Sequence, residues 1–381
     1  NLQGDTSGSI SISAPSVAGS NTLTLPKTTQ TLATENALGV RNLIINGDMS
    51  IAQRGTSTTG LQYNKDNNFP CCDRWQFSHF GSSSYTAAFT ASQSTDVPSG
   101  QGFSNSFKMD CTTADATLES DSALVVRQSL EGQFLQHLKY GTSSAEDLTL
   151  SFWVKSNLTG TFTMAIQHVD GSLYYGADYT IDTADTWEKK TITIPGDTTT
   201  AIADDNTVGM RLTFYLAVGS NYASGTNEQW TSTASVVNIA PNMTNNLGGS
   251  TSNEWYITGV QLEVGDTATP FEHRPYDMEF ARCLRYYEEI INYHGYHHNW
   301  NGSRADAMLW WKVQKRGTPT ISDNSSGITV TIYQTSTNST SVTTQYAGHN
   351  STQGYRFIAN GTGGKSGIVK GGLNIYVDAE I

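Results

Sequence analysis

The sequence predicts an all-β protein with an N-terminal β-ribbon, a central jelly-roll β-sandwich, one connecting helix and a small C-terminal antiparallel β domain. Only 15% of the residues are charged, and Ser, Thr, Asn and Gly are abundant, which suits many short strands joined by polar turns. Short apolar and polar alternations recur at a spacing typical of sandwiches, without the long period of a solenoid. The 8 Trp, 18 Tyr and 13 Phe indicate buried cores rather than a low-complexity chain.

The 381 residues are enough for two or three domains. We expect residues 1–40 to form an attachment or shaft segment, residues 41–275 a jelly-roll domain, and residues 276–381 the helix and the C-terminal β domain. The second boundary rests on Trp255–Val264, whose alternation and β-branched residues predict a strand. Gly265 ends this strand, and a helical pattern begins after Pro275.

The N-terminal segment contains two short alternating runs, Ser9–Pro15 and Asn21–Pro26, separated by a turn. One such ribbon buries too little surface to be stable alone. Its apolar residues therefore need copies from other chains, which predicts a homotrimer, or a docking surface on another protein. These residues are Ile10, Ile12, Leu23 and Leu25. A disordered linker is the alternative.

The sandwich begins with the apolar run Leu43–Ile45 and the turn signal Asn46-Gly47. We predict a short helix at Leu130–Leu138, and we expect Trp153 to lie in the core. The predicted strands are Trp75–His79, Tyr85–Thr90, Ser106–Cys111, Ala123–Ser129, Leu148–Val154, Gly160–His168, Thr186–Ile194, Thr207–Ala217 and Trp255–Val264.

The pattern after Pro275 predicts a helix over Asp277–Ile291, with Asp277 as its N-cap. Its apolar stripe contains Phe280, Leu284 and Tyr287. We expect the strands that follow to form a small antiparallel sheet packed on this helix. They are Ala307–Val313, Gly327–Gln334, Gly354–Ala359 and Leu373–Val377.

Several segments carry a family resemblance. They are the strand Trp255–Val264 and the segments Arg41–Asp48, Gln53–Gly55, Asp73–Trp75 and Ala281–Tyr287. In this order they resemble a jelly-roll domain of tail-fibre and other virion-appendage proteins of tailed bacteriophages, whose sandwich is similar to that of carbohydrate-binding modules. The motifs contain no set of residues that is typical of one kind of ligand. They therefore indicate a fold and a virion setting better than they indicate a ligand.

The resemblance implies a structural virion protein, a tail fibre that mediates attachment to the host surface through glycan binding. Its partners would be other copies in a homotrimer, other virion proteins through residues 1–40, and a host-surface glycan. The protein would be assembled in the bacterial cytoplasm and reside in the virion. The four cysteines, including the adjacent Cys71 and Cys72, are expected to be reduced and mostly buried.

Two other functions remain open. One is a purely structural appendage, such as a fibre shaft, a collar or a capsid decoration. The other is a glycan depolymerase, although the usual hydrolase and metalloprotease motifs are missing and we expect no enzyme activity. The net charge of −12 disfavours nucleic acid as a partner, and no apolar run is long enough to insert into a membrane.

The stretch from Tyr293 to Gly302 is the first candidate glycan site. Aromatic rings stack on the C–H faces of sugars, while amides and imidazoles bind hydroxyls. The candidate residues are Tyr293, Tyr296, His297, His298 and Trp300, and the second candidates are Tyr174 and Tyr175. The alternatives are a loop that packs between subunits for the first stretch and solvated loop tyrosines for the second.

The sequence contains two candidate metal sites. In the carbohydrate-binding jelly rolls that this domain resembles, a structural Ca²⁺ often joins the first and last strands, which implies Asp48 and Glu263 as ligands. Asp48 could instead cap the Asn46-Gly47 turn. His294, His297 and His298 could bind Zn, Ni or Fe around a symmetry axis, but they have no partner ligand at a diagnostic spacing. We expect no cofactor beyond the possible Ca²⁺.

Overall fold

The computed structural model describes residues 2–3, 9–10, 41–63, 69–81, 83–232, 239–291, 295–299, 304–323, 330–333, 339–360, 367–370 and 374–381. The chain divides into two compact units, Asn1–Leu38 and Gly39–Ile381. In the first unit, β1 (Leu2–Gln3) and β2 (Ser9–Ile10) pair antiparallel, with Leu2 opposite Ile10. Apart from Ser9 and Ile10, the two predicted ribbon runs lie outside the described residues.

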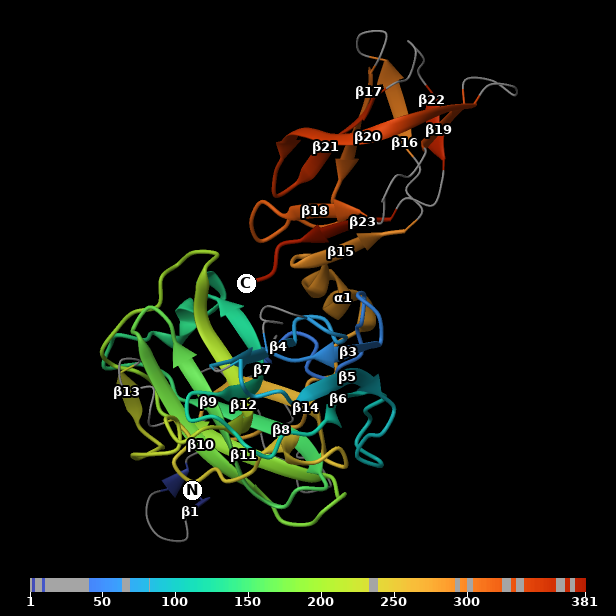
Figure 1. The fold of residues 1–381 in the computed structure, drawn as a ribbon. Coiled ribbons are helices and arrows are strands. Elements are labelled where there is room, and N and C mark those ends of the chain that lie inside the picture. The colour runs from blue at the N-terminus through green and yellow to red at the C-terminus, as the bar shows by residue number, and fades with distance from the viewer. Residues whose placement is uncertain are drawn as a thin grey trace, which may run out of the picture. The chain divides into compact units, whose positions relative to one another are not determined.

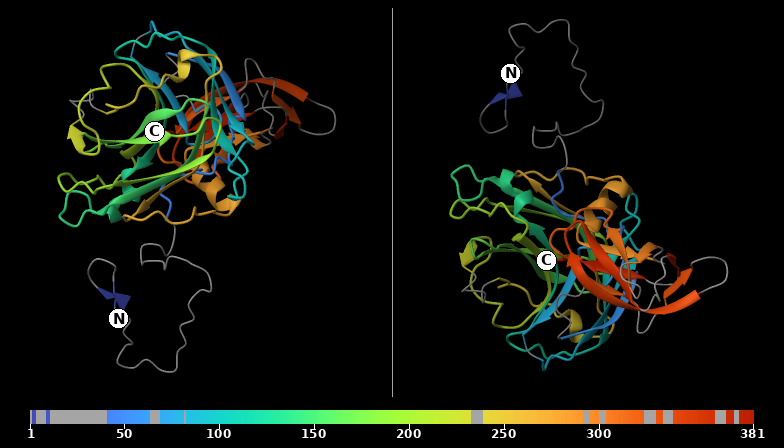
Figure 2. Two further views of the ribbon diagram at one scale, coloured as in Figure 1. Left: turned by 90° about the horizontal axis from the view of Figure 1, so that it is seen from below. Right: turned by 90° about the horizontal axis from the view of Figure 1, so that it is seen from above.

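The second unit contains a sandwich of two six-stranded antiparallel sheets, which confirms the predicted all-β class (Figures 1 and 2). Sheet 1 has the order β13-β10-β9-β12-β7-β4, and sheet 2 has the order β11-β8-β14-β6-β5-β3. The strands of sheet 1 are β4 (Gln76–Phe80), β7 (Ala123–Glu131), β9 (Gly160–His168), β10 (Leu173–Ile181), β12 (Val208–Val218) and β13 (Trp230–Ser232). Those of sheet 2 are β3 (Ser57–Leu61), β5 (Ala88–Ser94), β6 (Ser106–Thr113), β8 (Leu148–Ser156), β11 (Glu188–Ile194) and β14 (Glu254–Val264).

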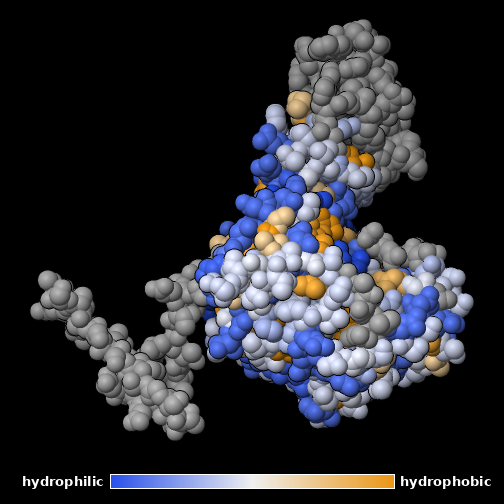
Figure 3. Space-filling view, turned by 90° about the vertical axis from the view of Figure 1, so that its left-hand side faces the viewer, coloured by the Kyte–Doolittle hydropathy of each residue, from blue (hydrophilic) through white to orange (hydrophobic). Residues whose placement is uncertain are grey.

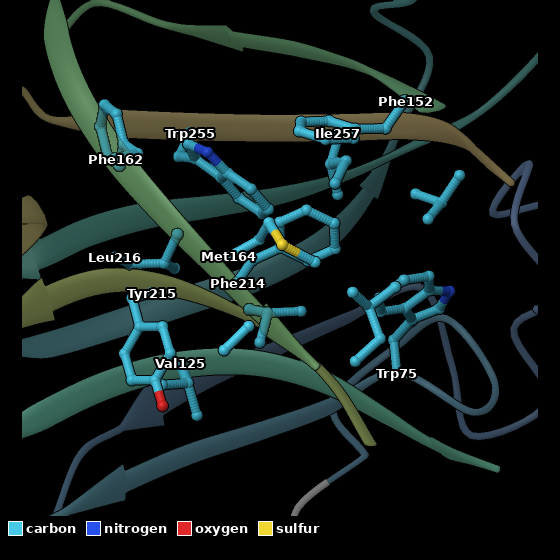
Figure 4. Packing of buried hydrophobic residues seen from close by; sticks show 14 of the residues in the cluster. Trp75, Val125, Phe152, Phe162, Met164, Phe214, Tyr215, Leu216, Trp255 and Ile257 are labelled. Atoms are coloured by element: carbon cyan, nitrogen blue, oxygen red, sulfur yellow. The ribbon is translucent and has the colours of Figure 1, made fainter. Parts of the chain in front are cut away.

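The core between the sheets is centred on Phe214 of β12 (Figure 4). Its ring centroid lies 5.1 Å from that of Phe152 in the opposite sheet, 6.0 Å from that of Trp255 and 6.3 Å from that of Trp75. All four side chains are fully buried. Burying a large aromatic residue contributes about 2 to 3 kcal/mol to folding, so this cluster holds the two sheets together.

Two sandwich predictions are wrong. Trp153 faces outward and is half-buried, because Phe152 and Val154 on either side of it point into the core. The predicted helix at Leu130–Leu138 is instead the end of β7 followed by two 3-10 turns, Gly132–Phe134 and Gln136–Leu138. The strand extends this far because Glu131 still pairs with Val208 of β12.

The C-terminal helix is shorter than predicted. α1 spans only Tyr276–Leu284, with Pro275 rather than Asp277 as its N-cap, and Tyr287–Ile290 form the strand β15. This strand pairs with β23 (Ile375–Asp378), which pairs in turn with β18 (Thr320–Asp323). Backbone pairing with the sequence-distant strand β23 therefore replaces the predicted continuation of the helix.

The remaining C-terminal strands form a second sheet, where a single small sheet was predicted. Six antiparallel strands close on themselves in the order β16-β17-β21-β20-β19-β22. They are β16 (Gly295–Asn299), β17 (Arg304–Trp310), β19 (Val330–Tyr333), β20 (Ser339–Asn350), β21 (Gly354–Asn360) and β22 (Gly367–Lys370). No helix within the described ranges has the length and apolar character needed to cross a membrane.

Several residues of the segments that carry the family resemblance meet in a largely buried junction between the sandwich and the end of the chain. Arg74 is 1% exposed and pairs with Glu380, while its guanidinium lies 3.5 Å from the ring centre of Tyr286. Arg54 pairs with Asp378 at 3.2 Å, and its guanidinium lies over the ring of Tyr287. We call this set the C-terminal junction; its members are Arg54, Arg74, Glu131, Arg285, Tyr286, Tyr287, Asp378 and Glu380.

Glu131 connects the junction to β7. Its fully buried carboxylate accepts hydrogen bonds from Nε and Nη2 of Arg285, both at 2.7 Å, and from the Tyr286 hydroxyl at 2.5 Å. Burial acts to raise the pKa of Glu131, but these hydrogen bonds outweigh it and hold the pKa below the ordinary value of 4.5. The ionised form is therefore favoured in the folded state.

The four cysteines are free and buried, in agreement with the sequence-based expectation. Burial raises the pKa of the Cys72 and Cys283 thiols well above the ordinary value. Thiols of this kind are poor nucleophiles, so these cysteines contribute to packing.

The close approach of the Asn46-Gly47 turn to β14 predicts a specific sensitivity. A Cβ at Gly47 would lie 2.2 Å from the carbonyl oxygen of Val260, so Gly47→Ala should destabilise the fold by about 1 to 3 kcal/mol. Gly317→Ala, where a Cβ would meet nothing within 4 Å, is the matched control and should change stability by less than about 1 kcal/mol. Urea denaturation measures both. Equal midpoints for the two variants would contradict this packing.

The junction also predicts a dependence on pH. Because the folded-state pKa of Glu131 is depressed, its contribution to stability is present above about pH 4.5 and is lost as the pH falls through the folded pKa. Arg285→Gln should cost about 2 kcal/mol at pH 7 and less at acidic pH, whereas Lys139→Gln, which breaks a surface pair with Glu146, should cost about 0.5 kcal/mol or less. Denaturation at pH 7 and at pH 3.5 compares them; a pH-independent loss in Arg285→Gln would contradict the assignment.

Candidate functional site

The outer face of sheet 1 carries a continuous row of polar side chains. Arg211 of β12 lies opposite Ser129 of β7 on one side and Gln167 of β9 on the other. Gln167 lies opposite Tyr174 of β10, which lies opposite Thr231 of β13. Neighbouring strands are about 4.8 Å apart, so these five residues, which we call the polar row, extend over about 19 Å.

Alternation along the strands places the polar row on the outside. Leu212 and Phe214 of β12 point into the core, so Arg211 and Thr213 point outward. Within the row Ser129 is buried, whereas Arg211, Gln167, Tyr174 and Thr231 are only half-buried and therefore accessible to a ligand.

Arg211 is fixed in position by two neutral neighbours. Its Nε donates to Ser129 Oγ at 3.2 Å, and its Nη1 donates to Gln167 Oε1 at 2.8 Å. Burial lowers the pKa of its guanidinium, although the group remains far from neutralisation at physiological pH. No carboxylate among the described residues forms an ion pair with Arg211.

Two further tyrosines and a second arginine lie beside the polar row. Tyr215 is buried at the floor of the face, and Tyr174 and Tyr222 lie near it. Burial raises the pKa of all three hydroxyls, so they remain neutral donors and acceptors. Arg127 of β7 lies opposite Thr213 and donates from Nε to Gln76 Oε1 at 2.6 Å. The face therefore combines aromatic rings with two guanidinium groups.

A loop closes the part of the face beside the polar row. The Ile239 carbonyl would be 2.3 Å from a Cβ at Gly176, so the loop passes directly over β10 there. Asp178 accepts hydrogen bonds from Thr163 Oγ1 and from Asn242 Nδ2, each at 2.7 Å, which holds the loop down. A hollow of about 10 Å³, room for one water, remains at this edge. It is lined by Tyr174, Gly176, Thr226, Gln229, Thr231, Ser232 and Ile239.

The structure separates the two tyrosines that the sequence paired. Tyr174 lies in the polar row, whereas Tyr175 points to the other side of β10, where it is buried with its ring centroid 5.6 Å from that of Trp230. Adjacent residues of a strand face opposite sides, so only Tyr174 can contact a ligand on this face. Arg211 was missed, although a charged residue within the apolar run of β12 is a signal in the sequence.

The outer face of sheet 2 is a second aromatic surface, but its polar groups are already paired. Trp187 Nε1 donates to Asp96 at 2.9 Å, and Lys155 pairs with the same carboxylate. The Lys155 Nζ also lies 4.3 Å from the ring centre of Tyr256. Few donors remain here to recognise a ligand, so sheet 1 offers the better candidate site.

Most of the first predicted glycan stretch cannot be assigned a geometry. Tyr293, His294 and Trp300 lie outside the described residues. Tyr296, His297 and His298 belong to β16, so this part is a strand rather than the predicted loop. The register places Tyr296 opposite Ile368 and His298 opposite Asp306. The glycan and metal hypotheses for this stretch therefore remain predictions.

The proposed calcium ligands are occupied separately. Asp48 accepts from Ser50 Oγ at 2.9 Å, two residues further along the chain. Glu263 accepts from Thr269 N at 2.9 Å, Thr269 Oγ1 at 2.6 Å and Gln261 Nε2 at 2.9 Å. The described ranges contain no group of three or more His, Cys, Asp or Glu residues placed to hold a metal ion, and the calcium hypothesis remains a prediction.

Comparison with known proteins finds fold-level similarity alone. No protein-family model matches the chain, and no curated protein matches it. Among solved structures, the chain is similar to the enzymatically active domain of tailspike protein 4 from bacteriophage CBA120, with a TM-score of 0.29 and 14% identity over 54% of this chain. The match spans only 21% of that tailspike structure.

Two carbohydrate-binding modules are also similar. One is a family 4 module, with a TM-score of 0.27 and 12% identity over 57% of this chain and 97% of the module. The other is the family 11 module of Clostridium thermocellum in complex with a β-1,3-1,4-mixed-linked tetrasaccharide, with a TM-score of 0.26 and 14% identity over 56% of this chain and 98% of the module. TM-scores this low carry no argument about the function of this chain.

Proposed function

We propose that this chain is a glycan-binding tail-fibre protein of a tailed bacteriophage and that it contacts host-surface glycans through the outer face of sheet 1. The observation that carries the proposal is the polar row, in which an aromatic ring, an amide and a guanidinium lie side by side on neighbouring strands. The proposal includes binding without cleavage.

The chemistry of the row matches the chemistry of a sugar. The Tyr174 ring can stack on the C–H face of a pyranose, and the Gln167 amide and the free N–H groups of Arg211 can bind its hydroxyls. The three side chains lie on paired strands, and a hydrogen bond between Arg211 and Gln167 holds these two in place. A ligand therefore loses little binding energy to ordering them.

The virion setting rests on the sequence motifs. The resemblance of residues 41–290 to tail-fibre proteins supports a location in the virion after assembly in the bacterial cytoplasm. Residues 1–40 would attach the chain to other virion proteins, and the protein would act as a homotrimer.

A purely structural appendage is the second candidate, and one observation favours it. The motif residues that carry the resemblance, such as Arg54, Arg74 and Tyr286, are used in the C-terminal junction rather than on an exposed face. They would be needed for the fold whether or not the protein binds a glycan.

Substitution of Tyr174 tests glycan binding. Tyr174→Ala should weaken binding to bacterial surface polysaccharides about tenfold, because loss of one stacking ring costs about 1 to 1.5 kcal/mol. Tyr276→Ala is the matched control, since Tyr276 is 61% exposed and lies on α1, outside sheet 1. Biolayer interferometry on a polysaccharide panel measures affinity, and a reducing-end assay on the same mixtures measures cleavage.

The outcomes separate the candidate functions. Binding that Tyr174→Ala weakens, without release of reducing ends, supports recognition. Absence of binding to cells and to every polysaccharide by a correctly oligomerised preparation would favour the structural role. Released reducing ends would establish a depolymerase.

A further inference from the structure

We propose that the polar row recognises an acidic sugar, whose carboxylate or phosphate group binds the Arg211 guanidinium. This inference rests on the proposed glycan-binding function and names the class of glycan. The anionic group would meet Arg211 near the middle of the row, with Tyr174 two strands away to stack on a neighbouring sugar.

Several N–H donors of Arg211 remain available for hydrogen bonds to a ligand. A guanidinium has five N–H donors in a fixed plane. Ser129 Oγ accepts from Nε, and Gln167 Oε1 accepts one hydrogen of Nη1. The second Nη1 hydrogen and both Nη2 hydrogens have no acceptor among the described residues. Nη1 and Nη2 therefore keep three N–H donors between them for hydrogen bonds to a carboxylate or phosphate.

Arg211 differs from most buried or half-buried cations of this protein, which have a carboxylate partner. The paired cations are Arg54, Arg74, Lys108, Lys155, Arg274, Arg285 and Lys315. An unneutralised cation removed from water is costly, as the lowered pKa of Arg211 also reflects. The chain has a net charge of −12 and 34 acidic residues, yet no carboxylate among the described residues pairs with Arg211. An anionic ligand would neutralise it.

A second positive charge lies on the same face. Arg127 is opposite Thr213, two residues along β12 from Arg211, so the two arginines are diagonal neighbours on adjacent strands. Diagonal Cβ atoms are about 7 to 8 Å apart, close enough for both guanidinium groups to act on one anion.

The acidic chain favours a sparsely charged glycan over a polyanion such as nucleic acid. Overall negative charge repels a polyanion over roughly one Debye length, about 8 Å at physiological ionic strength. A single carboxylate or phosphate per repeat meets little of this repulsion and gains the short-range contact with Arg211. Binding should therefore depend on the anionic group of the sugar rather than on total ligand charge.

The test uses the full chain and an array of bacterial surface polysaccharides that are neutral, uronate-bearing or phosphate-bearing. The uronate-bearing or phosphate-bearing members should bind most tightly. The tightest ligand is then converted to its neutral counterpart, by carboxyl reduction for a uronate or by dephosphorylation for a phosphate. This conversion should weaken binding about tenfold or more, since a charge-assisted hydrogen bond is lost, and it distinguishes the two anions.

Two variants assign the effect to Arg211. Arg211→Gln should bind the native and the neutralised ligand with equal, weak affinity, and Arg211→Lys should retain part of the discrimination. Lys189→Gln is the matched control, because Lys189 is an exposed cation on β11 of sheet 2 and its loss changes the net charge equally. It should leave the discrimination unchanged.

The outcomes are distinguishable from failure of the proposed function. If neutral glycans bind as tightly as acidic ones, or Arg211→Gln still discriminates, the inference is overturned, while a loss of binding in Tyr174→Ala keeps the glycan function. If no glycan binds, both fail. Equal binding of single-stranded DNA would show a non-specific anion surface and would also overturn the inference. Should Arg211→Gln not fold, the neutralised ligand still decides the question on the unmodified protein.

Discussion

The buried pairing of Arg74 with Glu380 is the interaction on which the rest of the structure depends. It joins the start of the sandwich to the penultimate residue of the chain, and Arg74 also donates from Nη2 to the backbone oxygen of Ser129 at 2.6 Å. Ser129 Oγ in turn accepts from Arg211. A single chain of contacts therefore runs from the C-terminal junction to the candidate ligand-binding face.

Burying this much charge has a cost that only complete pairing offsets. Removing one member of a buried ion pair leaves an uncompensated charge, which typically destabilises a protein by about 3 to 5 kcal/mol. The junction reduces the risk by giving each cation several partners. Arg54, for example, contacts Asp378, Glu380 and the Tyr287 ring. Such a network specifies one arrangement of β7 and β15, and with it the position of Ser129 in the polar row.

The chain uses arginine in two different ways, one in the C-terminal junction and one in the polar row. In the junction, Arg74 and Arg285 are paired with carboxylates and stabilise the fold. In the polar row, Arg211 is held only by neutral groups and keeps donors free. The surface of the sandwich seen in Figure 3 is largely hydrophilic, as suits a protein whose recognition depends on polar contacts rather than on an apolar patch.

Local patterns in the sequence predicted most of the sandwich strands but not the site. Strands such as β9 and β14 alternate clearly, and their predicted bounds agree with the structure within one residue. β10 was missed because Gly176, Ala177 and Asp178 have low strand propensity and are held by pairing with β9. The helix was extended too far because β15 owes its form to β23, which lies almost 90 residues downstream.

The polar row could not be predicted because it depends on register between distant strands. Arg211 and Gln167 are 44 residues apart, and nothing local shows that they become neighbours. The sequence did identify Tyr174, but as part of a tyrosine pair that strand alternation divides between two faces. Several residues of the motifs that the sequence analysis singled out, among them Arg54, Arg74 and Tyr286, belong to the junction rather than to the polar row.

Hydrogen–deuterium exchange of the full chain with its tightest-binding polysaccharide tests most directly whether sheet 1 carries the ligand. Added glycan should protect backbone amides in residues 160–181 and 208–218, which contain β9, β10 and β12, and leave residues 148–156 and 188–194 of sheet 2 unchanged. Protection confined to sheet 2, or to residues 295–299 of β16, with no change in β9, β10 and β12 would contradict the assignment.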